Sequence, residues 1–259
     1  ADSGWHASNL ADQVATFGRA GDIERAGQLA AEAVAIADRV YTAPHSRRAA
    51  AHCHLASHLL WRGRFAEAVD HYAVASDINR TLGVSDLHVQ ACHMFAGYAH
   101  AAVGDYRTAL AEAERSRAIL DQHDLPHSPT GYAACGLLAS VQLRLDDTDG
   151  AAGTLAGCPR PADGTPQLQH VQALAELQLA LGRTGEAARL AAELRGSRPP
   201  EAGDRYWMRP WMLSLLLARR AGDDDGFAAL VSELGEHAAA QPLADCLAAP
   251  AETRCLVFP

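Results

Sequence analysis

The segment Gly104-Asp105-Tyr106-Arg107-Thr108-Ala109 is one version of a short turn that recurs along the chain. Further versions begin at Gly21, Gly63, Gly182 and Gly222, and a degraded version begins at Asp146. The period is about 40 residues, which is typical of stacked structural units and not of one globular core. The recurring turn therefore predicts a repeat architecture.

Each turn lies between two segments whose apolar residues recur at helical spacing, so each unit is predicted to be a pair of amphipathic helices. We predict an all-α chain, a right-handed superhelical array of about six helix-turn-helix units that forms a single domain over residues 1–259. The units are expected near 1–44, 45–85, 86–128, 129–165, 166–203 and 204–241, with a tail at 242–259. In the second unit the helices are expected at 46–61 and 65–82. The second helix of the fourth unit is expected to be short, because glycines interrupt it.

Two positions near the turn hold small residues in several units. They lie seven residues before the turn glycine and twelve residues after it, and they are occupied by Ala56, Gly97, Ala175, Ala75 and Ser116. This pattern resembles the tetratricopeptide repeat (TPR), although each unit is longer than the roughly 34 residues of that repeat. The lengthened units resemble the helical arrays of large LuxR-type and antibiotic-regulatory transcription factors. That resemblance implies a sensor segment or a segment on which a partner docks.

The composition excludes several classes of function. A net charge of −9 argues against a nucleic-acid or anionic-membrane surface, because phosphate contacts require clustered cations. All 22 cationic residues are Arg, so the chain lacks the lysine of a Schiff base, of a nucleotide-binding loop or of a lysine general base. We therefore expect neither nucleic acid nor a membrane as a partner.

The cysteines and the apolar runs of the sequence bear on the cellular compartment of the protein. The six cysteines are far apart and include no C-x-x-C pair, so neither a zinc ribbon nor a redox dithiol is predicted. A reducing cytoplasm is the simplest setting for them. The sequence shows no apolar run of about 18 residues and no leader, so we predict no membrane span and no signal peptide. It also lacks a phosphate loop and a nucleophile elbow, and we expect no cofactor.

In arrays of this kind the first helix of each pair lines the concave face. Offsets of −10, −6 and −3 from the turn glycine are expected to point inward. The binding candidates chosen in this way are Cys53, Ser57, Met94, Tyr98, Gln172, Glu176, Met212 and Arg219. This mixture of polar and apolar side chains suits a peptide or a small organic molecule. The alternative is that some of these positions only pack between helices.

Histidine is the unusual residue, since eight of the 13 lie between residues 45 and 100. His54 and His58 are four residues apart and share one helical face. Candidate ligands of a transition metal are His54, His58 and His93, with Cys53 or Cys92 as a softer ligand. Candidates for acid/base catalysis near pH 7 are His54, His58, His93 and His100, with Tyr98. No carboxylate stands next to these pairs in the sequence to orient a ring, so we expect structural histidines and no metal.

Two tryptophans four residues apart, Trp207 and Trp211, open the first helix of the last unit. They are candidates for an aromatic wall that binds an apolar ligand or a proline-rich peptide. Alternatively, they cap the end of the array by packing on the fifth unit. The sequence leaves both possibilities open.

Two acidic loops, at 146–150 and 223–226, superficially resemble calcium loops. The twelfth ligand position holds Ala156 in one loop and Ser232 in the other, where a calcium loop requires Glu. The acids are instead predicted to be helix N-caps, which place negative charge at the positive end of the following helix.

The sequence favours a non-catalytic binding scaffold whose concave face captures a peptide, a protein partner or a small effector, in a regulatory setting. The alternative is an enzyme that uses a His-rich pocket of the same array for acid/base or metal chemistry. A third hypothesis is an oligomerisation module, which would present apolar patches along one edge.

Overall fold

The structure is a computed structural model that describes residues 4–19, 22–84, 87–161, 167–197 and 208–239, and all regular structure in these ranges is helical. The helices are α1 (Gly4–Arg19), α2 (Ile23–Val40), α3 (Ser46–Trp61), α4 (Phe65–Leu82), α5 (Leu87–Ala102), α6 (Tyr106–Gln122), α7 (Pro129–Arg144), α8 (Thr148–Ala156), α9 (Leu168–Ala180), α10 (Thr184–Ser197), α11 (Met208–Ala221) and α12 (Asp224–Ala239). None of the described helices combines the length and the apolar character needed to cross a bilayer.

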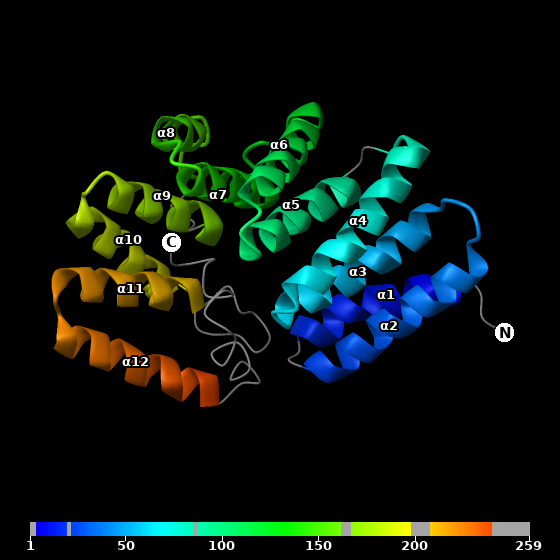
Figure 1. Cartoon of the computed structure of the whole chain (residues 1–259), viewed down its shortest axis with the longest axis horizontal. Coiled ribbons are helices and arrows are strands. Elements are labelled where there is room, and N and C mark those ends of the chain that lie inside the picture. Colours follow the sequence, from blue (N-terminus) through cyan, green and yellow to red (C-terminus); the bar gives the residue numbers. More distant parts are fainter. Residues whose placement is uncertain (1–3, 20–21, 85–86, 162–166, 198–207, 240–259) are drawn as a thin grey trace.

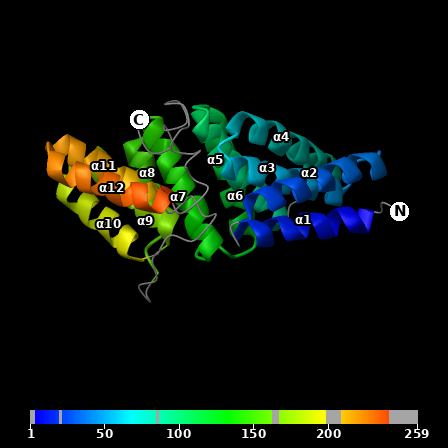
Figure 2. The same cartoon turned by 90° about the horizontal axis from the view of Figure 1, so that it is seen from below.

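Helices that follow one another in the chain are also neighbours in space. The successive pairs from α1 and α2 to α11 and α12 form hairpins, and each hairpin packs on the next. Figure 1 shows the hairpins following one another along an arc, and Figure 2 shows the same arrangement from below. Helix α8 has only nine residues, and α7 packs against α9 as well as against α8. The predicted all-α repeat fold is confirmed, including its short α8.

The recurring turn ends one helix and begins the next. Gly104 takes a φ of 82°, a left-handed conformation that residues other than glycine rarely adopt. The carboxylate of Asp105 then accepts a hydrogen bond from the backbone N–H of Thr108 at 3.2 Å and caps α6. In the degraded turn Asp146 takes the left-handed conformation, with a φ of 59°. The turn geometry is therefore retained where the glycine is missing.

Both acidic loops cap helices, as predicted. The carboxylate of Asp147 accepts a hydrogen bond from the backbone N–H of Gly150 at 2.8 Å, at the start of α8. Asp223 accepts one from the backbone N–H of Gly226 at 2.9 Å, at the start of α12. Each carboxylate satisfies a backbone donor that the first turn of a helix leaves without an intrahelical partner.

The interior of the hairpins is built on alanine. At the same place after five of the turns the chain carries an alanine with no exposed surface, namely Ala26, Ala68, Ala109, Ala151 and Ala187. The small residues that suggested the repeat are buried as well, among them Ala56, Ala75, Ser116 and Ala175. Short side chains at these points let the two helices of a hairpin approach closely.

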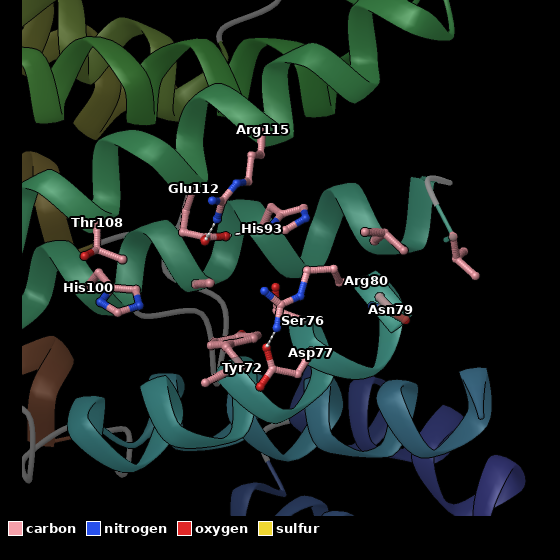
Figure 3. Close-up of a pocket in the computed structure, with 14 residues that line it drawn as sticks. Tyr72, Ser76, Asp77, Asn79, Arg80, His93, His100, Thr108, Glu112 and Arg115 are labelled. Atoms are coloured by element: carbon pink, nitrogen blue, oxygen red, sulfur yellow. Dashed lines mark hydrogen bonds and ion pairs between the residues drawn. The ribbon is translucent and has the colours of Figure 1, made fainter. Parts of the chain in front are cut away.

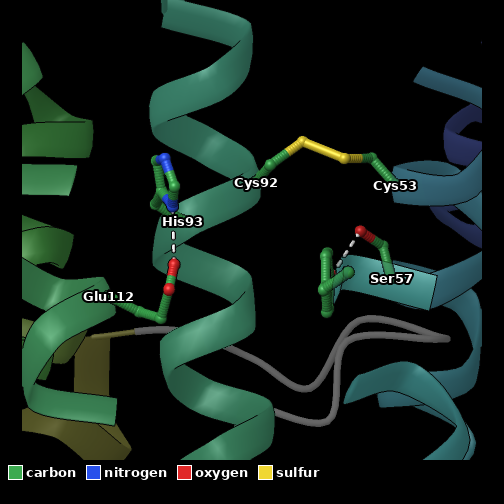
Figure 4. The surroundings of a disulfide bond; sticks show 6 residues. Cys53, Ser57, Cys92, His93 and Glu112 are labelled. Carbon is green, nitrogen blue, oxygen red and sulfur yellow. Dashed lines mark hydrogen bonds and ion pairs between the residues drawn. A yellow bond between two sulfur atoms is a disulfide. The ribbon is translucent and has the colours of Figure 1, made fainter. Parts of the chain in front are cut away.

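A disulfide bond joins two consecutive units. Cys53 of α3 and Cys92 of α5 are bonded, with their Cα atoms 6.0 Å apart (Figure 4). Nothing in the sequence indicated this cysteine pair, and contact of Cys53 with a ligand stays a prediction. The two residues are 39 positions apart, so only the packing of α3 on α5 brings them together. The cytoplasmic setting inferred from the cysteines stays a prediction.

Close packing of α9 on α7 is expected to be sensitive to one methyl group. A Cβ at Gly136 would lie 2.9 Å from the backbone nitrogen of His170, so Gly136→Ala should lower the free energy of unfolding by about 1–3 kcal/mol. Gly153→Ala in α8 is the matched control, because a Cβ there meets nothing within 4 Å. Urea unfolding followed by circular dichroism measures both variants. Equal stability of the two variants would contradict the packing.

Removal of the disulfide is expected to destabilise the chain. The double variant Cys53→Ala/Cys92→Ala should lose about 2–4 kcal/mol, because the bond closes a loop of 39 residues in the unfolded chain. Urea unfolding with and without a reducing agent tests this. The reductant should weaken the unmutated protein and leave the double variant unchanged, and an unmutated protein indifferent to reductant would rule the bond out.

Candidate binding site

A cleft of about 470 Å³ lies between α4 and α6, the second helices of two consecutive units, with α5 contributing to its lining. Figure 3 shows side chains from the three helices lining it. Its polar residues are Ser76, Asp77, Asn79 and Arg80 from α4, His93 and His100 from α5, and Thr108, Glu112 and Arg115 from α6. We call this space and these residues the α4–α6 cleft. Its volume lies in the range of sites that bind small ligands or a few peptide side chains.

A cluster of His93, Glu112 and Arg115 lies in the cleft. Nδ1 of His93 is 2.5 Å from one carboxylate oxygen of Glu112, and Arg115 donates to the other oxygen at 2.5 Å. Burial alone would raise the pKa of Glu112. The hydrogen bond from His93 and the positive charges of His93, Arg115 and His100 outweigh burial and lower this pKa below its ordinary value of 4.5. Glu112 is therefore a buried carboxylate that is ionised at neutral pH.

The α4 side of the cleft offers hydrogen-bond donors. Arg80 donates to Asp77 on the same helix at 2.8 Å, and both side chains are largely exposed. Exposed pairs of this kind contribute only about 0–1 kcal/mol, so exchanging one for contact with a ligand costs little. Next to Arg80, Asn79 is buried and its side-chain nitrogen has no hydrogen-bond partner. A buried donor without an acceptor is unfavourable, and an acceptor atom of a ligand would relieve it.

Several residues predicted to line the groove lie between helices instead. Met94 and Tyr98 are buried in the core, and the Tyr98 hydroxyl donates to the backbone carbonyl of Ala133 in α7 at 3.4 Å. Oγ of Ser57 lies 2.9 Å from the hydroxyl of Tyr72, between α3 and α4. The α4–α6 cleft opens on a different face of α5 from Met94 and Tyr98. Contact of these residues with a ligand stays a prediction.

The candidates in α9 form a polar contact with α7. Gln172 donates to Glu176 at 2.8 Å, and both side chains are buried. Arg144 of α7 reaches the other oxygen of Glu176 at 3.4 Å. This buried ion pair fixes α9 against α7, and the structure does not bring it to the α4–α6 cleft.

The candidates of the last unit are partly described. Trp211 is buried in α11, and the guanidinium of Arg219 lies 5.5 Å from the ring centroid of Phe227 in α12. Trp207 and the side chain of Met212 lie outside the described residues. Burial of Trp211 agrees with the capping alternative, and an aromatic ligand wall stays a prediction.

The three candidate metal ligands His54, His58 and His93 are not among the groups of potential metal ligands that converge within the described residues. His54 lies beside His88, with ring centroids 6.2 Å apart, and its pKa is lowered by burial and by the nearby His88. His58 faces Gly27 of α2, where a Cβ would lie 2.6 Å from Nε2 of the ring. His93 faces α6 instead. The three rings therefore serve three different helix contacts.

The partners of His93 were missed because they come from another helix. Three polar contacts join residues that are 19 positions apart in the sequence. In each contact, one residue lies eleven positions before the first residue of a turn, and the other lies eight positions after it. The pairs are His52 with His71, His93 with Glu112, and Cys135 with Thr154. The repeat register is thus the signal that could have identified Glu112 from the sequence.

Hairpins of a period near 40 residues, closed by a glycine turn and stacked along an arc, define a TPR-like helical repeat protein. Solved structures of this fold are similar to the chain. A kinesin light chain of Podosopora anserina with nearly identical TPR-like repeats is 22% identical, covering 74% of this chain and 95% of its own, with a TM-score of 0.62.

Two further structures cover more of the chain. Rap protein complexed with Competence and Sporulation Factor is 15% identical over 91% of this chain and 64% of its own, with a TM-score of 0.65. BtubC from P. vanneervenii is 17% identical over 89% of this chain and 91% of its own, with a TM-score of 0.53. No family model and no curated protein matches the sequence. These likenesses establish the fold, and the resemblance to LuxR-type regulators stays a prediction.

The buried Glu112 carboxylate predicts a pH-dependent stability. Glu112→Gln should lower the free energy of unfolding at neutral pH by about 2 kcal/mol, since a hydrogen bond to a charged group contributes about 1.5–3 kcal/mol. The pKa of Glu112 is lowered in the folded state, so this stabilisation is present above pH 4.5 and is lost as the pH falls through the folded-state value. Urea unfolding across the acid range should show the two proteins converging.

Glu114→Gln on the exposed face of the same helix is the control for this measurement and should have little effect at any pH. A stability difference between Glu112→Gln and the unmutated protein that stays constant down to pH 3 would contradict the assignment.

Proposed function

We propose that this chain is a non-catalytic interaction scaffold and that the α4–α6 cleft binds a peptide segment of a partner protein. The observation that carries the proposal is a cleft of about 470 Å³ lined by charged side chains of two consecutive units, with the unpartnered nitrogen of Asn79 at its edge. A peptide backbone supplies carbonyl acceptors for such donors. The fold supports the proposal, since Rap protein was solved in complex with Competence and Sporulation Factor.

The lining favours a segment with an acidic side chain. Arg80 and Arg115 are both exposed, and each carries five N–H donors of which an acid on the same helix uses only some. Planar guanidinium groups bind carboxylates in a bidentate manner. His93 and His100 add further donors to the lining. We infer that a carboxylate of the peptide lies between the two arginines while its backbone contacts the α4 side.

One other ligand and one catalytic function remain as outcomes of the tests. A small acidic effector would use the same arginines, and the regulatory role inferred from the sequence fits either ligand. The 2.5 Å contact between His93 and Glu112 favours acid/base catalysis as a second candidate, because a carboxylate that orients an imidazole is a common feature of general bases. Hydrolysis of p-nitrophenyl acetate above the buffer rate, abolished by His93→Gln, would favour catalysis over the scaffold.

Peptide selection tests the proposed function. A random peptide library displayed on phage is selected against the immobilised chain, and the enriched peptides are measured by calorimetry. Arg80→Ala/Arg115→Ala should weaken their binding by about tenfold or more, which corresponds to about 1.4 kcal/mol. Arg189→Ala is the matched control, because Arg189 forms the same kind of exposed pair, with Glu186 three residues before it, outside the cleft.

The peptides enriched in this selection should carry Asp or Glu. Failure to enrich any peptide, or enriched peptides that bind the double variant as tightly as the unmutated chain, would overturn the assignment of the cleft.

A further inference from the structure

Two thiols and an imidazole from three segments meet where α7, α8 and α9 join. Cys135 lies in α7, Cys158 follows the end of α8, and His170 lies in α9. Each residue offers one ligand atom, and the three atoms all lie within 4.8 Å of one another. All three residues are at most 1% exposed. We call these residues the Cys/His cluster.

Close backbone packing places His170 beside Cys135. Gly136 follows Cys135, and a Cβ at Gly136 would lie 2.9 Å from the backbone nitrogen of His170. The backbone of α9 therefore rests directly on α7 at this point. A larger residue at position 136 would push His170 away from the two thiols.

A second glycine places the segment before α7 against the cluster. A Cβ at Gly131 would lie 2.6 Å from the backbone oxygen of Leu125, so this segment packs closely on the start of α7. The neighbouring carbonyl of Pro126 accepts a long contact of 3.8 Å from the thiol of Cys158. The sequence thus uses two glycines to bring separate segments of backbone around the same two sulfur atoms.

The imidazole of His170 is poorly satisfied. The residue is 1% exposed, and neither ring nitrogen makes a hydrogen bond of good geometry, although the backbone of Cys158 lies close to the ring. Its ring meets that of Tyr132 edge to face, with centroids 5.4 Å apart. A neutral imidazole carries one N–H donor and one lone pair, and leaving such groups buried and unpaired is unfavourable. A metal ion would use the lone pair, and the nearest candidate ligands are the two thiols.

A second imidazole reaches the cluster from its exposed side. His127 is exposed, and its imidazole interacts electrostatically with the side chain of Cys158. A thiolate is the form of cysteine that binds metals.

We propose that Cys135, Cys158 and His170 bind one Zn²⁺ ion, with His127 or a water molecule as the fourth ligand. Two thiolates and one or two imidazoles are a common donor set for tetrahedral zinc. Binding releases the thiol protons of Cys135 and Cys158 to solvent and changes no oxidation state. The two thiolate charges balance the charge of the ion, which makes the complex suitable for a buried position.

The site departs from the sequence expectation of no metal and does not depend on the function proposed for the α4–α6 cleft. Sequence motifs for zinc sites contain closely spaced ligands. No two of these ligands are close in the sequence, so no motif indicated the site. Its role is structural. The ion links α7 and α9 to the residue that follows α8.

Metal analysis tests the proposal in a variant that lacks the second group of possible metal ligands. Cys53, His88 and Cys92 also converge within 4.8 Å and would become available if the disulfide were reduced. The full chain is therefore made as Cys53→Ala/Cys92→Ala, grown with zinc, purified without a histidine tag under reducing conditions, and analysed by mass spectrometry for metals. We expect about one zinc per chain.

Adding Cys158→Ala or His170→Ala to this background should reduce the bound zinc to a small fraction, and adding His123→Ala, an exposed histidine before the cluster, should leave it unchanged. Co²⁺ titration of the metal-free protein provides a readout that needs no variant. It should give a thiolate-to-cobalt charge-transfer band and the visible bands of tetrahedral Co²⁺. A strong chelator should lower the Tm of the zinc-loaded protein, because the ion binds only the folded state.

Three results would overturn the proposal. The first is absence of both bound zinc and the cobalt bands in folded, reduced protein. The second is full zinc retention in folded Cys158→Ala and His170→Ala variants. The third is a disulfide between Cys135 and Cys158 in protein isolated anaerobically from zinc-containing medium, because bonded sulfurs cannot bind the ion as thiolates. If the variants do not fold, the cobalt titration of the parent protein decides.

Discussion

Helices of one hairpin approach closely here because alanine occupies the centre of their interface. Ala26, Ala68, Ala109, Ala151 and Ala187 stand at the same register after their turns, and none has exposed surface. A larger side chain at these points would force the helices apart. Longer polar side chains pack within hairpins, as His93 and Glu112 do, and also where one hairpin meets the next, as Arg144 and Glu176 do. The α4–α6 cleft and the Cys/His cluster both lie at such joints.

Features fixed by a few neighbouring residues could be predicted from the sequence. Helices α3 and α4 begin and end at the predicted residues, because a left-handed glycine and the chain around it define where one helix stops and the next starts. The face that a residue presents is harder to predict. A helix turns about 100° per residue, so a small error in register moves a side chain from a groove into the core. Met94 and Tyr98, which were expected on the groove, are buried, and their contact with a ligand stays a prediction.

For the candidate sites, too, the sequence shows which residue types a region contains but not which residues of other helices they contact. The abundance of histidine drew attention to residues 45–100, and the ring of His93 is held there by Glu112 on another helix. The repeat itself contains that information, since His52 and His71 make the equivalent contact one unit earlier. Contacts that recur in register are predictable once one unit is known. Within the described residues the bond between Cys53 and Cys92 occurs once, so no other described unit indicates it.

The Cys53–Cys92 disulfide and the Cys/His cluster each lie where two consecutive units meet. The helices at the second of these contacts include the short α8. In a repeat array each unit is stabilised mainly by its neighbours, so the weakest joint limits the whole. Helix α8 has nine residues where α4 has 18, and its buried residues are Ala151 and Leu155. Helix α8 therefore contributes few buried apolar residues to the fourth unit. A bound ion at Cys135, Cys158 and His170 would tie the end of this short helix to α7 and α9.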